Sequence, residues 1–305
     1  MKKILTTLGP MDNDQLGMIL PHEHIFVDLR TWKDPGYAKA DTQEVVSLMA
    51  KEINKAQLWG VTAIVECSTV GVGRRADIDK AVSEATNFPL IVPTGIYREP
   101  WIPDWAHEAS KEYLKEWMTK ELQSEIENSK VQAGWIKLSA GEDGMTECEK
   151  KILRAASLAG ILTHAVIGSH TVKGGVALEQ LDIIEGMGYT PNRFIWIHAQ
   201  AEPDFKLHLE VAKRGAYIEY DGIGNGDTDD YYMNSIRKMV NAGFENQLLI
   251  SHDRGWYDPA QPGGGTPKPY TYINETFVPK LGKAGFNEEA VKKLTNTNPF
   301  NAFAR

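Results

Sequence analysis

The motif His22-Glu23-His24 stands at the end of the apolar run Gly17–Pro21. If this run is a strand, its side chains alternate, so His22 and His24 share one face and Glu23 lies on the other. Two imidazoles about 7 Å apart on one strand face can converge on a single divalent metal ion. A lone His-x-His motif is weak evidence, so a metal site requires further ligands from elsewhere in the chain.

Ligand-type residues also stand at the ends of four later apolar runs, and they are Lys137, His164, His198 and Asp253. Imidazoles and a carboxylate are ligands that suit Zn²⁺, or Mn²⁺, Co²⁺ or Fe²⁺ according to availability. Lysine is the exception, because a dication repels an ammonium group and only the neutral or chemically modified side chain can bind. Five strand ends closing on such residues indicate a metal centre.

Short apolar runs alternate with amphipathic helical stretches, which is the pattern of repeated βα units. The predicted strands are Met18–His24, Val61–Cys67, Leu90–Tyr97, Gly134–Leu138, Ile161–Val166, Phe194–Ala199, Ala216–Asp221 and Gln247–Asp253. The predicted helices include Gln43–Leu58, Ser110–Asn128, Glu147–Ala159, Gly175–Met187, Lys206–Arg214 and Tyr231–Ala242. Glycine suits the left-handed position that ends a helix, and it precedes five of the strands at Gly60, Gly160, Gly188, Gly215 and Gly243.

Eight such units without a break in composition predict an α/β protein with a single (β/α)8 TIM barrel. We expect residues 1–17 to form a short N-terminal β-hairpin and residues 18–305 to form the barrel. An open nucleotide-binding sheet is disfavoured, because Gly71-Val72-Gly73 lacks the third glycine of a phosphate-binding loop. Residues 255–269 have loop composition and are long enough to cover an active site. In a barrel the predicted ligands would all face one rim.

The composition excludes several functional classes. The chain has 305 residues and a formal net charge of −8 with scattered Lys and Arg, which argues against partners such as nucleic acid or an anionic membrane surface. No stretch approaches the length of a membrane span. Cys67 and Cys148 form no CxxC motif, so neither a disulfide framework nor a cysteine-based zinc site is expected. The start of the chain is unlike a signal peptide, and we expect a cytoplasmic protein.

The strand-end order His-x-His, Lys, His, His, Asp resembles that of the phosphotriesterase family within the amidohydrolase superfamily. The likeness covers essentially the whole chain, from Leu8-Gly9-Pro10 through Ala133–Lys137 and Ser251–Asp253 to Asn298-Pro299. It implies a hydrolase with two divalent metal ions, zinc before manganese, cobalt or iron. It also implies that Lys137 is carboxylated by CO₂ and that the resulting carbamate bridges the two ions.

The same resemblance assigns the remaining ligands. It implies that His22, His24 and Asp253 hold the more buried ion, and that His164 and His198 hold the more exposed one. Two dications sharing one water lower the pKa of that water, so that a bridging hydroxide exists at neutral pH and attacks the substrate. The resemblance further implies that Asp253 accepts the hydroxide proton as a catalytic residue.

The type of ester is indicated by three positions. Tyr97 matches the place where lactonase-like family members carry a tyrosine near the metal bridge, where a phenol could orient hydroxide or an ester oxygen. The acidic residue and the histidine that form a proton relay in true phosphotriesterases correspond here to Ala201 and Gly222. We therefore expect hydrolysis of a carboxylic ester, above all a lactone, with a phosphotriesterase as the alternative.

Arginine follows two of the candidate catalytic residues, Arg98 after Tyr97 and Arg254 after Asp253. A guanidinium at a catalytic rim can hold a carboxylate or phosphate in a bidentate manner, so both are predicted to bind an anionic small-molecule substrate. Trp256 is predicted to supply an apolar wall.

Other interpretations stay open for several of these residues. Tyr97 could simply pack in the core, the arginines could form structural ion pairs, and Lys137 could pair with Glu142 or Asp143. His170, assigned to the loop after the fifth strand, could touch substrate. A barrel that binds metal or a partner without catalysis is an alternative of a different class. The resemblance also implies a homodimer.

Overall fold

The computed structural model describes residues 2–226 and 228–305, and its parallel strands form a barrel. The barrel strands are β3 (Met18–Phe26), β4 (Val61–Glu66), β5 (Leu90–Ile91), β6 (Pro93–Thr94), β7 (Trp135–Ser139), β8 (Ile167–His170), β9 (Phe194–Ile197), β10 (Tyr217–Tyr220) and β11 (Leu248–Ile250). Parallel pairing runs from β3 to β5 and from β6 to β11, and β5 and β6 are two parts of one interrupted strand. The Asp253 amide donates to the His22 carbonyl at 3.1 Å, which closes the circle. The predicted barrel is confirmed.

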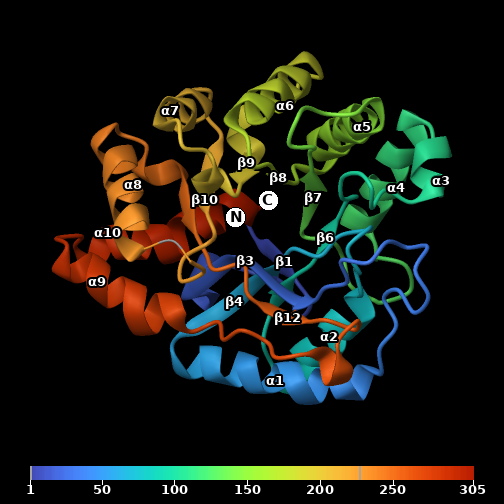
Figure 1. Ribbon diagram of the computed structural model, residues 1–305, viewed down its shortest axis with the longest axis horizontal. Coiled ribbons are helices and arrows are strands. Elements are labelled where there is room, and N and C mark those ends of the chain that lie inside the picture. Colours follow the sequence, from blue (N-terminus) through green and yellow to red (C-terminus); the bar gives the residue numbers. More distant parts are fainter. Residues whose placement is uncertain (1, 227) are drawn as a thin grey trace.

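Helices surround these strands (Figure 1). They are α1 (Thr42–Leu58), α2 (Ala76–Thr86), α3 (Asp104–Glu108), α4 (Lys111–Gln123), α5 (Glu147–Thr163), α6 (Gly174–Gly186), α7 (Phe205–Lys213), α8 (Asp229–Asn241), α9 (Val278–Lys283), α10 (Glu288–Lys292) and α11 (Asn298–Phe303). In the described ranges, none of them combines the length and the apolar character that crossing a membrane requires.

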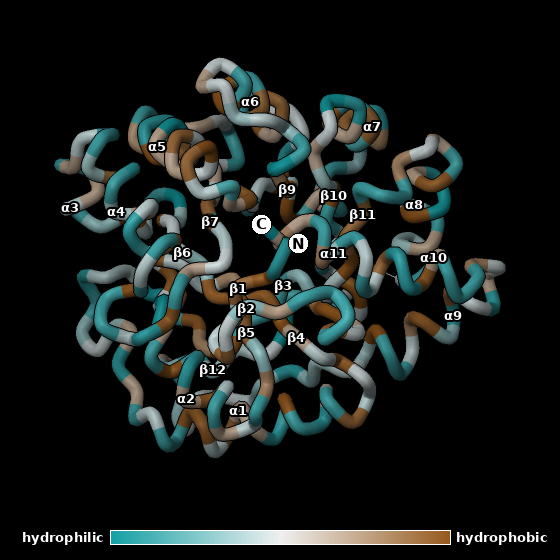
Figure 2. Tube along the Cα trace, turned by 180° about the vertical axis from the view of Figure 1, so that it is seen from behind, coloured by the Kyte–Doolittle hydropathy of each residue, from teal (hydrophilic) through white to brown (hydrophobic). Residues whose placement is uncertain are grey.

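The predicted N-terminal hairpin is confirmed by the antiparallel pair β1 (Ile4–Thr6) and β2 (Gly9–Met11). Seen from behind, the hairpin and α11 lie across one end of the barrel, where both chain termini also lie (Figure 2). Lys3 and Arg305 exchange backbone hydrogen bonds of 3.1 and 3.0 Å at this end. The opposite end, where the strands finish, is therefore the end available for a site.

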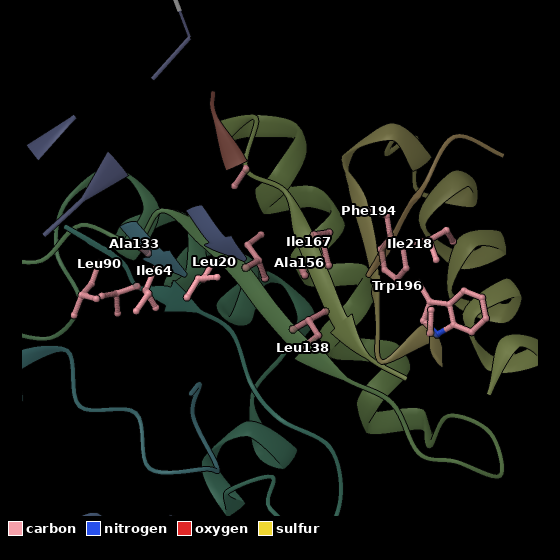
Figure 3. Close-up of a cluster of buried hydrophobic side chains, with 14 of the residues drawn as sticks. Leu20, Ile64, Leu90, Ala133, Leu138, Ala156, Ile167, Phe194, Trp196 and Ile218 are labelled. Carbon is pink, nitrogen blue, oxygen red and sulfur yellow. The ribbon is translucent and has the colours of Figure 1, made fainter. Parts of the chain in front are cut away.

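Two apolar layers follow from the alternation of side chains along the strands. Residues such as Ile19, Ala63 and Trp135 form the cluster inside the barrel. Their neighbours Leu20 and Ile64 belong to the larger cluster shared with the helices, part of which Figure 3 shows. The position of a residue relative to these layers shows whether its side chain can reach the barrel interior.

The strand predicted over Ile161–Val166 is wrong, because α5 continues to Thr163 and β8 begins only at Ile167. Gly160 lies inside this helix, where an added Cβ would be 2.5 Å from the ring of Tyr189. Glycine therefore serves close packing at this position and does not end the helix. Four of the five predicted helix-ending glycines do have positive φ, namely Gly60, Gly188, Gly215 and Gly243.

The loop predicted over residues 255–269 begins with a short strand, β12 (Gly255–Tyr257). This strand pairs in parallel with the end of β3, so that Gly255 lies opposite His24 and Tyr257 opposite Phe26. The pairing places Trp256 beside the end of β3. The segment therefore contributes to the rim of the barrel from its first residues onward.

Candidate active site

A β-bulge in β3 directs the two histidines of the His-x-His motif into the barrel. Leu20 pairs with Ile64, but Glu23 pairs with Glu66, so β3 has one extra residue between the two pairs. Without it, even-numbered residues of β3 would face the helices, as Leu20 does. The extra residue reverses the alternation and turns His22 and His24 inward, with ring centroids 5.5 Å apart.

His198 and Asp253 leave the ends of their strands in the left-handed region, with φ of 63° and 55°. Such a conformation costs a non-glycine residue about 1 kcal/mol or more, and it is often found at functional sites. Here it brings both side chains to the mouth of the barrel. The His198 ring lies 4.9 Å from that of His22, and Asp253 Oδ1 lies 3.2 Å from His24 Nε2.

The fifth barrel strand contributes His170, and His164 lies elsewhere. His164 is exposed and follows α5 with φ of 58°, at the opposite end of β8 from the cluster. His170 ends β8, and its ring centroid lies 4.3 Å from that of His198. The apolar run from Ala159 to Ile167 contains both the last helical turn and the strand start, and periodicity alone does not separate them.

Lys137 points into the barrel from the middle of β7 and is only 2% exposed. Its Nζ lies 5.9 Å from the ring centroid of Trp135, the previous inward-facing residue. Within the described ranges no carboxylate forms an ion pair with Lys137, and Glu142, one of its two proposed partners, pairs with Arg98 at 3.2 Å. A buried lysine without a counter-ion is costly, which points to a functional role.

Each imidazole of the cluster is held through Nδ1 by a partner outside it. These contacts are His22 with Glu219 at 2.8 Å, His24 with Ser68 at 2.8 Å, His198 with Asp221 at 2.6 Å and His170 with Tyr97 at 3.1 Å. Such contacts fix the ring orientation and leave Nε2 available to a metal ion. Sequence reasoning missed Glu219 and Asp221. The available signal was two carboxylates spaced i, i+2 in a buried strand.

Glu23 holds the strained turn that carries Asp253. Its Oε1 accepts from the Ser251 hydroxyl at 2.8 Å and from the His252 amide at 3.0 Å, and its Oε2 accepts from the Arg254 amide at 2.7 Å. His252 Nδ1 also lies 2.6 Å from Glu23 Oε1. Glu23 thus supports the position of Asp253 from outside the cluster.

A cavity of about 270 Å³ opens above the histidines. Among its lining residues are Tyr97, Arg98 and Trp256, three of the predicted contacts, together with Val27, Leu29, Val72 and Trp101. Trp256 packs edge-on against His24 with ring centroids 5.4 Å apart. Tyr97 lies at the wall with its hydroxyl on His170, so it positions that histidine.

Arg254 does not line this cavity, and the prediction that it binds substrate finds no support in its position. Its Nε donates to Asn225 Oδ1 at 3.0 Å, and its guanidinium lies 5.2 Å from the ring centroid of Tyr272. The side chain turns away because Glu23 binds the Arg254 amide, while Asp253 occupies the inward position. The sequence could not distinguish these two orientations.

Comparison with known proteins places this arrangement in a family. The family model described as "Phosphotriesterase family" matches residues 2–303. The chain belongs to the phosphotriesterase family. It is 26% identical over 296 residues to the phosphotriesterase homology protein of Escherichia coli, covering 96% of this chain and 100% of that one.

Two solved structures of the phosphotriesterase family share the fold over nearly their whole length. A lactonase from Listeria monocytogenes superposes with a TM-score of 0.86 at 26% identity, covering 99% of this chain and 98% of that one. A mutant of the organophosphorus hydrolase from Deinococcus radiodurans gives 0.87 at 26% identity, covering 98% and 97%. Both proteins are named for hydrolytic activities, and this chain is a phosphotriesterase-family hydrolase.

Phosphotriesterase-family hydrolases carry a binuclear metal centre, and the residues present here fit one. The metal-binding atoms of His22, His24 and Asp253 all lie within 4.8 Å of one another. Asp253 Oδ1 is buried without a hydrogen-bond donor in the described ranges, and the Nε2 atoms of both histidines face it at 3.8 and 3.2 Å. A second group, His22 and His198 with Asp221, meets through Nδ1, so we interpret it as the supporting hydrogen bonds.

In the metal-free cluster, the pKa values of His22 and His24 are shifted in opposite directions. Burial and the charge of Lys137 lower the pKa of His22 to about 4, so this imidazole is neutral as metal binding requires. Burial also disfavours protonated His24, but Asp253 and Glu66 outweigh it and raise the pKa of His24 to about 9. A metal ion must displace this proton.

The raised pKa of His24 predicts how the stability of the metal-free protein depends on pH. Because the pKa of about 9 exceeds the ordinary 6.5, the stabilisation is fully present below pH 6.5 and is lost as pH rises through 9. The loss should reach up to about 3 kcal/mol. Urea unfolding in the presence of a chelator at pH 6.5, 8 and 9.5 measures the free energy of unfolding. In His24→Gln, this part of its dependence on pH should be absent. Equal slopes in both proteins would refute the prediction.

Proposed function

We propose that this protein opens small lactones that carry an anionic group. The observation that carries the proposal is Arg98, whose side chain lines the cavity beside the histidine cluster. Apart from Lys137 and the histidines, Arg98 is the one cationic side chain lining the cavity in the described ranges. A lactone of this kind needs both an activated water and a cation for its charged substituent, and the cavity can supply both.

The geometry supports one change in the ligand set that was predicted from the sequence. His22, His24 and Asp253 would hold one ion, and His170 would join His198 at the other. Lys137 would bridge the two ions after its neutral amine attacks CO₂, forming an N–C bond and releasing one proton to solvent. When bound, the two ions, zinc by preference, would supply hydroxide near neutral pH and polarise the carbonyl oxygen of the substrate.

The surroundings of Asp253 and Tyr97 support a role for each of them in the proposed reaction. Burial raises the pKa of Asp253, but the contact with His24 and the charges of the other histidines outweigh it and hold this pKa below its usual range. Asp253 is therefore a carboxylate that can accept the proton of the attacking water. Burial raises the pKa of Tyr97 to about 12, so its neutral phenol serves as a hydrogen-bonding group toward His170.

Two unpaired donors favour an oxygen-rich, charged substrate. Arg98 Nε and Trp256 Nε1 are buried and have no hydrogen-bond partner in the described ranges, and both residues line the same cavity. Each such donor costs about 1–3 kcal/mol until an acceptor arrives. The other end of Arg98 pairs with Glu142, which is 50% exposed, so this ion pair is weak and an incoming anion can replace it.

The cavity size favours a small ring. About 270 Å³ lies just below the range of roughly 300–1,000 Å³ that is usual for drug-sized ligands. A five- or six-membered lactone with one charged substituent fits this volume better than a long acyl chain does. The likeness to a lactonase supports the same substrate class.

Hydrolysis of organophosphate triesters is the alternative, supported by the likeness to an organophosphorus hydrolase. The residues at the two relay positions argue against it. Ala201 has no titratable side chain, and an added Cβ at Gly222 would be 2.5 Å from the Tyr232 hydroxyl. A histidine at position 222 would not fit without moving Tyr232, so this chain lacks the proton relay that the family resemblance assigns to triesterases.

The test is proton release by the metal-loaded protein on matched substrates. Lactones of equal ring size, neutral, carboxylated or phosphorylated, are compared with organophosphate triesters. Arg98→Gln should raise KM for the anionic lactones by roughly 10- to 100-fold, because a charge-assisted hydrogen bond is worth about 1.5–3 kcal/mol. It should change the neutral lactone little. Arg254→Gln removes the same charge outside the cavity and is the control. Faster turnover of triesters than of any lactone would overturn the proposal.

A further inference from the structure

Three metal-binding side chains meet away from the histidine cluster. Glu99 lies in the segment after β6, His107 in α3 and Cys148 in the first turn of α5, and their ligand atoms all lie within 4.8 Å of one another. We propose that Glu99, His107 and Cys148 form a second, separate metal site that takes Zn²⁺, with a water as fourth ligand. This proposal does not depend on the lactone substrate.

The distances suit tetrahedral zinc. With bonds of about 2.0 Å to nitrogen and oxygen, two ligands of a tetrahedral ion lie about 3.3 Å apart. His107 Nε2 and Glu99 Oε1 are 3.3 Å apart. A thiolate at about 2.3 Å from the ion would lie about 3.5 Å from the other ligands, and the ligand atom of Cys148 already lies within 4.8 Å of both.

The three segments that carry these ligands are tied together. The Glu99 amide donates to Glu149 Oε1 at 3.1 Å, and Glu149 also forms the capping box of α5 with Thr146. Lys151 of α5 donates to three carbonyls at the end of α3, those of Ala106, His107 and Ala109 at 3.0, 2.7 and 2.8 Å. Its ammonium is therefore already bound by oxygen atoms. A site built on a fixed scaffold needs little reorganisation to bind an ion.

A surface ion pair is the simpler interpretation of His107 and Glu99, whose side chains are 41% and 33% exposed. It does not account for the thiol of Cys148, whose contact to protein oxygen here is a weak one of 4.0 Å to the Ala106 carbonyl. The exposure of the pair leaves a path for an ion to enter. The sequence prediction against a cysteine-based zinc site considered only closely spaced cysteines, and spacing could not show three ligands from distant segments.

A metal ion bound at the second site would also affect the active-site cavity, because one segment of the chain contributes to both. Glu99 directly follows Arg98 and lies two residues before Trp101, and both of these residues line the cavity. An ion bound to Glu99 would restrain this segment against α3 and α5. Hydrogen exchange of the amides of residues 97–99 and of Trp101 should therefore slow when the site is filled.

The test uses the full chain with cobalt as a spectroscopic probe. Cobalt added to the metal-free protein should produce a thiolate-to-cobalt charge-transfer band, since the band requires a thiolate ligand and the proposed ligands of the active-site centre include no cysteine. Cys148→Ser should abolish the band, and His107→Gln should weaken cobalt binding by about 10-fold or more. Cys67→Ser is the matched control, because Cys67 lines the main cavity and should not be the ligand.

Three results would overturn the second site. They are absence of the band in the wild-type protein, its persistence in Cys148→Ser, and its loss in Cys67→Ser. His107 is partly exposed, so His107→Gln is expected to fold even if Cys148→Ser does not. An unchanged cobalt affinity in that variant would equally refute the proposal.

Discussion

Replacing Lys137 with alanine is expected to lower lactone turnover by about a thousand-fold or more, equal to roughly 4 kcal/mol of transition-state stabilisation. The side chain is buried in the barrel and has no carboxylate partner in the described ranges, so its amine is available for carboxylation. Without the proposed carbamate, both metal ions would lose a shared ligand. Elemental analysis should therefore find less bound metal in Lys137→Ala, together with the loss of turnover.

A rescue experiment separates the bridging role from a structural one. Bicarbonate with a short carboxylic acid should partly restore metal content and turnover in Lys137→Ala, because a carboxylate can enter the space left by the side chain. Lys137→Met is the control, since it fills that space and leaves no room for the acid. Wild-type metal content and turnover in Lys137→Ala would rule out the bridge.

His170→Ala is expected to lose one of the two metal ions and about a hundred-fold or more in turnover, whereas His164→Ala should stay within about three-fold of the wild type. The reason is the position of the two rings. His170 lies 4.3 Å from His198 at the end of β8, while His164 is exposed at the other end of that strand. Metal content and kcat of the two variants, measured side by side, decide between them.

The opposite outcome has an equally clear meaning. Loss of metal from His164→Ala with normal His170→Ala would restore the ligand assignment made from the sequence. It would also mean that α5 ends near Gly160 and that the strand begins earlier than the structure places it. A drop in both variants with normal metal content would point to destabilisation, which their unfolding curves in urea would reveal.

The sequence was sufficient for the barrel and for the proximity of most of the predicted ligand residues. Strand–helix alternation is a local property, and strand ends in a parallel barrel meet at one rim, so His22, His24, Lys137, His198 and Asp253 could be brought together from spacing alone. The hairpin and four of the helix-ending glycines were predictable for the same reason, because turn conformations depend on nearby residues.

Only the tertiary structure decided the points where local patterns have two solutions. The apolar run across His164 fits either a helix end or a strand, and in the structure α5 continues to Thr163 with Gly160 packed against Tyr189. The alternation along β3 gave His22 and His24 one face, but the bulge determined which face. The direction of Arg254, the supporting carboxylates Glu219 and Asp221, and the Glu99 cluster all depend on contacts between distant segments, which spacing along one chain does not encode.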